Sequence, residues 1–147
     1  MSVPTWKRSV SKIQFIYTCF ELNKEIGRIT TKVPKKYRTN YCDELIKECM
    51  EALKHLQIGN SIVVADRHYM LMDRAKHFST AIGILENILS ISYIFFEMMR
   101  NNGEIKNEWV DKSEELIGNY CDSIIRMTKK VIEKDKQRYE KYFDNYK

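Results

Sequence analysis

The chain has 147 residues, with 25 lysines and arginines against 20 aspartates and glutamates, a net charge of +5. This length suits one domain with its own hydrophobic core. The start of the chain has no signal-peptide pattern, and the most apolar stretch, residues 82–96, is short and interrupted by Glu86 and Asn87. We therefore expect no membrane span and a cytoplasmic protein.

The first predicted helix runs from about residue 5 to residue 32. Its apolar residues recur at helical spacing and predict one buried face, made of Phe15, Cys19, Leu22, Ile26, Ile29 and Val33. Pro34 ends this helix, because proline disfavours helical backbone at the preceding residue and has no N–H to donate.

The second predicted helix begins at Asn40 as its N-cap, with Asp43 and Glu44 in its first turn to complement the helix dipole. Its predicted buried face is Leu45, Cys49, Ala52, Leu56, Gly59 and Val63. The third helix runs from near Asp66 to about Arg100, and Gly103 closes it in a left-handed conformation. Its predicted buried face is Leu71, Ala75, Phe78, Ile82, Leu85, Leu89, Ser92, Phe96 and Met99.

The fourth predicted helix runs from Asn107 to Tyr146. Its buried face includes Val110, Ser113, Ile117, Tyr120, Ile124, Thr128 and Val131. Short connections between long helices predict an all-α fold, an antiparallel up-down-up-down four-helix bundle. We assign residues 1–132 to this bundle and residues 133–147 to a basic, aromatic C-terminal helical extension. Its aromatic residues either stack on nucleic-acid bases or pack on a neighbouring subunit.

The first and third helices each carry a second apolar row. On the first helix this row is Val10, Ile13, Tyr17 and Phe20, and on the third it is Ile84, Ile91, Phe95 and Met98. A helix that is apolar on two sides is either deeply buried or contacts another subunit. Because no helix is central in a four-helix bundle, we predict a homo-oligomer with the first of these rows at its interface. A broad core face is the alternative.

Positive charge gathers at the two ends of the chain. Residues 1–38 carry nine basic against two acidic side chains, and residues 126–147 carry eight against four, whereas residues 39–125 have a net charge of −6. Such asymmetry indicates an anionic partner.

No catalytic or metal-binding motif occurs in the sequence, so we predict that the protein is not an enzyme and uses no metal or cofactor. His55 follows Glu51 by four residues, and His77 follows Asp73 by four. Each spacing is typical of a hydrogen bond on a helix surface. The cysteines form no CxxC pair and are interpreted as reduced core residues: Cys19, Cys42, Cys49 and Cys121.

Four segments carry a family resemblance: VPKKYR (33–38), LIKECMEALKHLQIGN (45–60), AKHFSTAIGILENILSISY (75–93) and ELIGNYCDSI (115–124). Over about residues 15–130 the chain resembles the accessory variability determinant (Avd) proteins of diversity-generating retroelements. These belong to a wider four-helix-bundle family that includes proteins encoded in intervening sequences of large ribosomal RNA. The chain has Asn119 and Ile124 where members often carry arginine and tryptophan.

The resemblance implies a ring-forming, usually pentameric bundle that binds a reverse transcriptase together with its template RNA or complementary DNA. The alternative is a protein-binding helical scaffold of the ribosomal-RNA intervening-sequence type, without a reverse transcriptase. In the first case we predict phosphate contacts at the basic residues around Pro34, namely Lys24, Arg28, Lys32, Lys35, Lys36 and Arg38.

Overall fold

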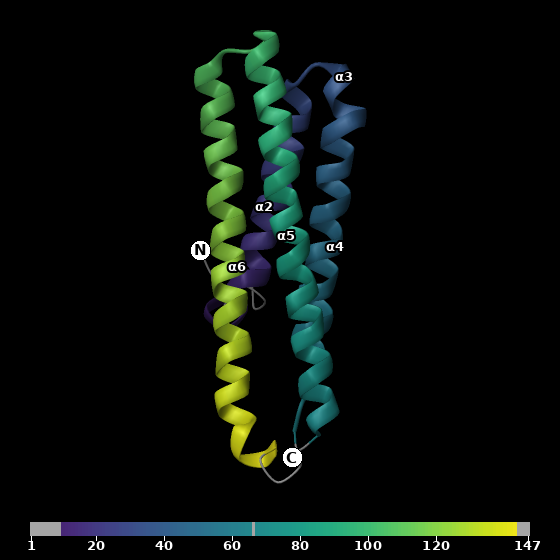
Figure 1. Ribbon diagram of the computed structural model, residues 1–147, viewed down its shortest axis with the longest axis vertical. Coiled ribbons are helices and arrows are strands. Elements are labelled where there is room, and N and C mark those ends of the chain that lie inside the picture. The colour runs from purple at the N-terminus through teal and green to yellow at the C-terminus, as the bar shows by residue number, and fades with distance from the viewer. Residues whose placement is uncertain (1–9, 66, 144–147) are drawn as a thin grey trace, which may run out of the picture.

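The computed structural model describes residues 10–65 and 67–143, and in these ranges it contains helices and turns but no strand. Its long helices are α2 (Val10–Lys32), α4 (Asp43–Ser61), α5 (His68–Asn102) and α6 (Asn107–Phe143), which lie side by side along the long axis (Figure 1). The predicted all-α fold is confirmed. The predicted start of the first helix before residue 10, Asp66 and Tyr146 lie outside the described residues.

The core lies between the four long helices. Both α2 and α5 pack against α4 and against α6. The buried face predicted for the first helix is confirmed, because all six of its residues, from Phe15 to Val33, are buried. Helical spacing alone was sufficient there, because the backbone from Phe15 to Lys32 is helical; the helix is kinked before this face begins, at Ile13.

The break at Pro34 is confirmed, but it is shorter than the sequence suggested. Helix resumes immediately as α3 (Lys35–Tyr37), continues through a π-helical turn, η1 (Arg38–Cys42), and runs into α4. The predicted N-cap at Asn40 is therefore wrong. Asn40 lies inside η1, where its Nδ2 donates to the carbonyl of Lys36 at 3.2 Å. Proline has a backbone suited to the start of a helix, so Pro34 both ends α2 and precedes the next one.

The end of α4 corrects a second prediction. Leu45, Cys49, Ala52, Leu56 and Gly59 are buried as expected, but Val63 is 76% exposed. The helix ends at Ser61 and the backbone at Ile62 is extended, so helical spacing no longer applies beyond it. Neighbouring side chains of extended backbone point to opposite sides, and Val64 is buried in place of Val63.

The buried face of α5 is broader than the predicted row. Phe78, Ile82, Leu85, Ser92, Phe96 and Met99 are buried as expected, and Leu71, Ala75 and Leu89 are half-buried. Phe95, which we had placed in the second, subunit-facing row, is fully buried in the core. This prediction was wrong because Tyr37 and Tyr41, in the connection after Pro34, pack on this side of α5 and cover Phe95. Gly103 has the predicted left-handed backbone, with φ of +64°.

Helix α5 also corrects the expectation that no stretch is long enough to span a membrane. By length and composition alone it could do so, because its 35 residues contain an 18-residue window of mean hydropathy 1.4. In this structure 39% of that window is buried. Core helices meet the same test, and α5 contributes Phe78, Phe95 and Phe96 to the core.

Helix α6 continues without a break past residue 132, where the C-terminal extension was expected to begin. Val110, Ser113, Ile117, Ile124 and Thr128 are buried as predicted, while Tyr120 and Val131 are half-buried. Asp135, inside the predicted extension, accepts a hydrogen bond from Nε of Arg74 on α5 at 2.6 Å. The first turn of the extension is thus held against the bundle.

Gly59 of α4 lies directly against the buried ring of Phe78. A Cβ at Gly59 would lie 2.7 Å from Cε1 and 2.9 Å from Cδ1 of this ring. The ring has little freedom to move, because Phe15 packs against it edge-on at 5.6 Å and the guanidinium of Arg74 lies 4.9 Å from its centre.

We predict that Gly59→Ala lowers the free energy of unfolding by about 1–3 kcal/mol, the usual cost of overpacking a core. Gly83→Ala is the matched control, since a Cβ at exposed Gly83 in α5 meets no atom within 4 Å. This control should raise the free energy of unfolding by about 0.5–1 kcal/mol through helix propensity. Urea denaturation followed by circular dichroism measures both, and a Gly59→Ala variant as stable as the wild type would contradict the packing described.

Candidate nucleic-acid interface

Tyr37 fastens the first turn after Pro34 to the end of α5. Its side chain is 3% exposed, and its ring meets Phe95 edge-on at 5.9 Å. Asn102 donates a hydrogen bond from Nδ2 to the hydroxyl oxygen of Tyr37. An aromatic pair of this geometry adds stability beyond the apolar area that it buries.

Tyr41 strengthens the same contact one helical turn later. Its ring lies 5.4 Å from that of Phe95 and 6.5 Å from that of Tyr37, and its hydroxyl donates to Sδ of Met98 at 2.7 Å. Tyr37 and Tyr41, the two tyrosines that follow Pro34, therefore both pack on α5. In this arrangement they hold the backbone in place, and the stretch presents cations to solvent.

All six predicted phosphate contacts are exposed. Lys24, Arg28 and Lys32 follow one another at four-residue spacing on α2, which places them along one side of that helix. Lys35, Lys36 and Arg38 follow in α3 and at the start of η1, at the upper end of the molecule in Figure 1.

Three of the six cations form ion pairs within the chain, and each pair reduces the charge available to a partner. Lys24 pairs with Glu21 at 3.4 Å, and Arg28 pairs with Glu25. Lys36 pairs with Glu104, in the connection between α5 and α6. The hydrogen bond that Lys36 donates to Glu104 raises the pKa of Lys36 above its usual value.

The other three cations keep their charge uncompensated. Lys32 and Lys35 have no carboxylate within 4 Å in the part of the chain that the structure describes. Arg38 donates from Nε to the carbonyl of Val33 at 3.2 Å and from Nη2 to that of Thr31 at 3.4 Å. It thereby caps the end of α2 without meeting a negative charge. We refer to Lys32, Lys35, Lys36 and Arg38 as the basic turn.

The predicted subunit-facing row of α2 is half-buried within the single chain. Ile13, Tyr17 and Phe20 all fall in this class, and Ile13 and Phe20 pack against the core. Val10 belongs to α2, but its side chain lies outside the described residues. In the second apolar row of α5, Met98 is exposed. Its neighbours Tyr93 and Ile94 are 65% and 52% exposed, although neither was predicted to belong to that row.

No three histidine, cysteine, aspartate or glutamate side chains gather at a possible metal site within residues 10–65 and 67–143.

The four cysteines are buried and have free thiols, as the sequence predicted. Burial raises the pKa of Cys121 to about 12. The pKa of Cys19 is raised as well, first by its hydrogen bond with Cys49 and then by burial. Thiols of this kind are poor nucleophiles at neutral pH.

Comparisons of the chain with protein-family models, with curated proteins and with solved structures gave no match. The resemblance to the Avd proteins therefore stays a prediction that rests on the four sequence segments quoted above.

A histidine pair links α4 to α5. Nδ1 of His55 lies 2.9 Å from Nδ1 of His77, and the rings stack with their centres 5.2 Å apart. From the sequence, we expected each histidine to bond a carboxylate four residues earlier in its own helix, His55 with Glu51 and His77 with Asp73. For His55 the nearest oxygen of that partner, Glu51, lies 4.0 Å from Nε2. The close contact is between helices, and at this distance one Nδ1 must donate while the other, unprotonated, accepts.

Burial, and then the neighbouring His77, lower the pKa of His55. The unfolded chain therefore binds a proton at His55 more tightly than the folded chain. As a result, the free energy of unfolding falls as the pH drops through the ordinary pKa of histidine, about 6.5. Glu51 opposes the shift and Lys54 adds to it, both from α4.

We predict that His55→Gln removes part of this dependence of stability on pH. Urea denaturation at several pH values between about 5 and 8 measures it, and an unchanged profile in the variant would contradict the role given to the pair.

Proposed function

We propose that this chain is a non-catalytic accessory protein of the Avd type. In this proposal it forms an up-down-up-down bundle, assembles into a homo-oligomeric, pentameric ring, and binds nucleic acid and a reverse transcriptase in the cytoplasm. It thereby supports mutagenic reverse transcription in a diversity-generating retroelement. The observation that carries the proposal is the positive charge of the basic turn, in which Lys32, Lys35 and Arg38 form no ion pair within the described residues, next to Tyr37, which is buried against α5.

Contacts between helices support the bundle topology. Arg74, in the second turn of α5, bonds Asp135 near the end of α6. Arg100, near the end of α5, bonds Asp111 and Glu114 in the first turns of α6. The histidine pair likewise joins the second half of α4 to the first half of α5. Such pairings are expected when consecutive helices run in opposite directions.

The chemistry of the basic turn suits phosphate groups. A phosphate that binds Lys32 or Lys35 displaces no intramolecular carboxylate, whereas one that binds Lys36 must compete with Glu104. Lysine contacts with phosphates supply affinity and position without reading the base sequence. This fits an accessory protein that serves a template regardless of its sequence.

The double variant Lys32→Gln/Lys35→Gln tests the basic turn. It should weaken the binding of single-stranded RNA and lower the slope of log K against log salt by about 1.4, since each lost phosphate contact contributes about 0.7. Fluorescence anisotropy over a series of salt concentrations measures both quantities. Lys54→Gln/Lys76→Gln is the control with the same change in charge, at exposed positions of α4 and α5. An equal loss in both variants, or no loss in either, would remove the basic turn from the proposal.

The proposed ring is tested at Tyr17. Ile13 and Phe20 pack on the core of their own chain, so we choose Tyr17→Glu from the same row, and circular dichroism checks that this variant is folded. We expect light scattering to give a multiple of the 17.6 kDa chain mass for the wild type and a smaller mass for the variant. Tyr69→Glu, at an exposed residue of α5, should keep the wild-type mass. A wild type that stays monomeric at all concentrations would contradict the proposed ring.

A second candidate is a protein-binding scaffold of the ribosomal-RNA intervening-sequence type. The exposed apolar side chains of Tyr93 and Ile94 on α5 favour it, because grouped apolar side chains at a surface are typical of protein contacts. This candidate predicts negligible RNA binding at physiological salt in a protein that still binds its protein partner. The reverse transcriptase partner rests on the sequence resemblance, and co-purification with a reverse transcriptase encoded beside this gene would test it.

A further inference from the structure

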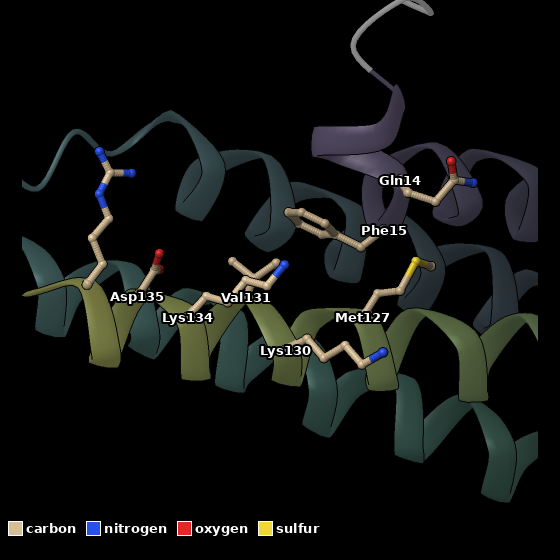
Figure 2. Close-up of a pocket in the computed structure, with 8 residues that line it drawn as sticks. Gln14, Phe15, Met127, Lys130, Val131, Lys134 and Asp135 are labelled. Carbon is tan, nitrogen blue, oxygen red and sulfur yellow. The ribbon is translucent and has the colours of Figure 1, made fainter.

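A second basic region lies at the other end of α2, far from the basic turn. There, a pocket of about 600 Å³ opens between the first described turns of α2 and the last turns of α6 (Figure 2). This volume is in the usual range for pockets that bind small organic molecules. Neither the basic turn nor the predicted subunit-facing row contributes a residue to it.

The cations of this pocket come from one face of α6. Lys130, Lys134 and Arg138 follow one another at four-residue spacing, about 6 Å apart along the helix axis. The pocket also contains the carboxylate of Asp135, but Arg74 binds both of its oxygens, at 2.6 and 3.5 Å. Within the described residues, no carboxylate lies within 4 Å of any of the three cations. The pocket therefore has a net positive charge.

Apolar side chains form the rest of the pocket wall. Figure 2 shows Phe15 of α2 facing Val131 and Lys134 of α6, with Met127 and Gln14 toward the neighbouring end of the pocket. Phe15 is buried against Phe78, whereas Met127 and Val131 are half-buried and offer an apolar surface to an aromatic ring. A ligand that matches this pocket carries several negative charges in a row and an aromatic or apolar group beside them.

The segment that precedes α2 in sequence carries no negatively charged side chain that would complement this pocket. Residues 1–9, which precede α2, contain Lys7 and Arg8 and no aspartate or glutamate. Charge complementarity favours a ligand from outside the chain. Phosphates in a row beside flat bases are the features of a single nucleic-acid strand.

We propose that this pocket binds a segment of single-stranded nucleic acid, with successive phosphates on Lys130, Lys134 and Arg138 and a base against Met127 and Val131. This inference rests on the proposed function and adds a second contact to it. Phe15 and Lys32 lie about 26 Å apart along α2, at 1.5 Å per residue. A sufficiently long strand therefore contacts both the pocket and the basic turn of one chain.

The double variant Lys130→Gln/Lys134→Gln tests the pocket. Its matched control is Lys129→Gln/Lys136→Gln, which removes the same charge from the same helix at exposed positions that do not line the pocket. With a fluorescent single-stranded RNA, we expect the pocket variant to bind roughly tenfold more weakly and to lower the salt slope by about 1.4. The control variant should stay close to the wild type, and circular dichroism confirms that both variants are folded.

Photo-crosslinking locates the base. An RNA that contains 4-thiouridine should crosslink to the tryptic peptides that carry Met127 or Val131, and the crosslink should weaken in the Lys130→Gln/Lys134→Gln variant. Equal weakening in the pocket variant and its control, or crosslinks confined to other peptides, would overturn the pocket assignment.

The outcomes separate this inference from the proposed function. If only the Lys32→Gln/Lys35→Gln variant loses binding, the proposed function stands and the pocket assignment fails. If the wild type binds no RNA at any salt concentration, both fail. Binding of anionic phospholipid vesicles that depends on Lys130 and Lys134, without RNA binding, would also overturn the assignment, because it would make the ligand a lipid.

Discussion

The burial of Tyr37 is the contact on which the candidate interface depends. Its ring packs on Phe95 and its hydroxyl accepts a hydrogen bond from Asn102, so the short connection at Pro34 is fixed to the far end of α5. Lys36 and Arg38 flank this buried residue on the chain and remain exposed. Because the backbone beneath them is already ordered, binding a phosphate costs little conformational entropy beyond that of the side chains.

Ion pairs within the chain determine how much positive charge around Pro34 is available to a binding partner. The sequence contains a run of six cations around Pro34, but Glu21 and Glu25 partly neutralise it from within α2. Those two pairs follow from three-residue spacing on a helix and are visible in the sequence. The pair between Lys36 and Glu104 joins residues 68 positions apart, so only the fold reveals it. Around Pro34, Lys32, Lys35 and Arg38 form no ion pair within the described residues, and a second group of cations without an ion pair there lines the pocket on α6.

The fold was predictable where a helix continued without interruption. The buried face from Phe15 to Val33 followed from periodicity, whereas the prediction for Val63 failed because α4 ends two residues before it. The prediction for Phe95 failed because Tyr37 and Tyr41, from the connection after Pro34, pack on it. The contact between His55 and His77 joins two helices, and spacing within one helix contains no information about it. The pocket was hidden for a related reason: the sequence shows the lysines of α6 but not where Phe15 of α2 lies relative to them.

We propose that this helical bundle binds nucleic acid through lysines and arginines that form no ion pair within the described residues. A titration of the wild-type protein with single-stranded RNA over a series of salt concentrations tests it most directly. The account predicts measurable binding near physiological salt, with log K falling linearly and steeply as log salt rises, because each neutralised phosphate releases counterions. Binding that does not change with salt, or no binding even at low salt, would contradict it.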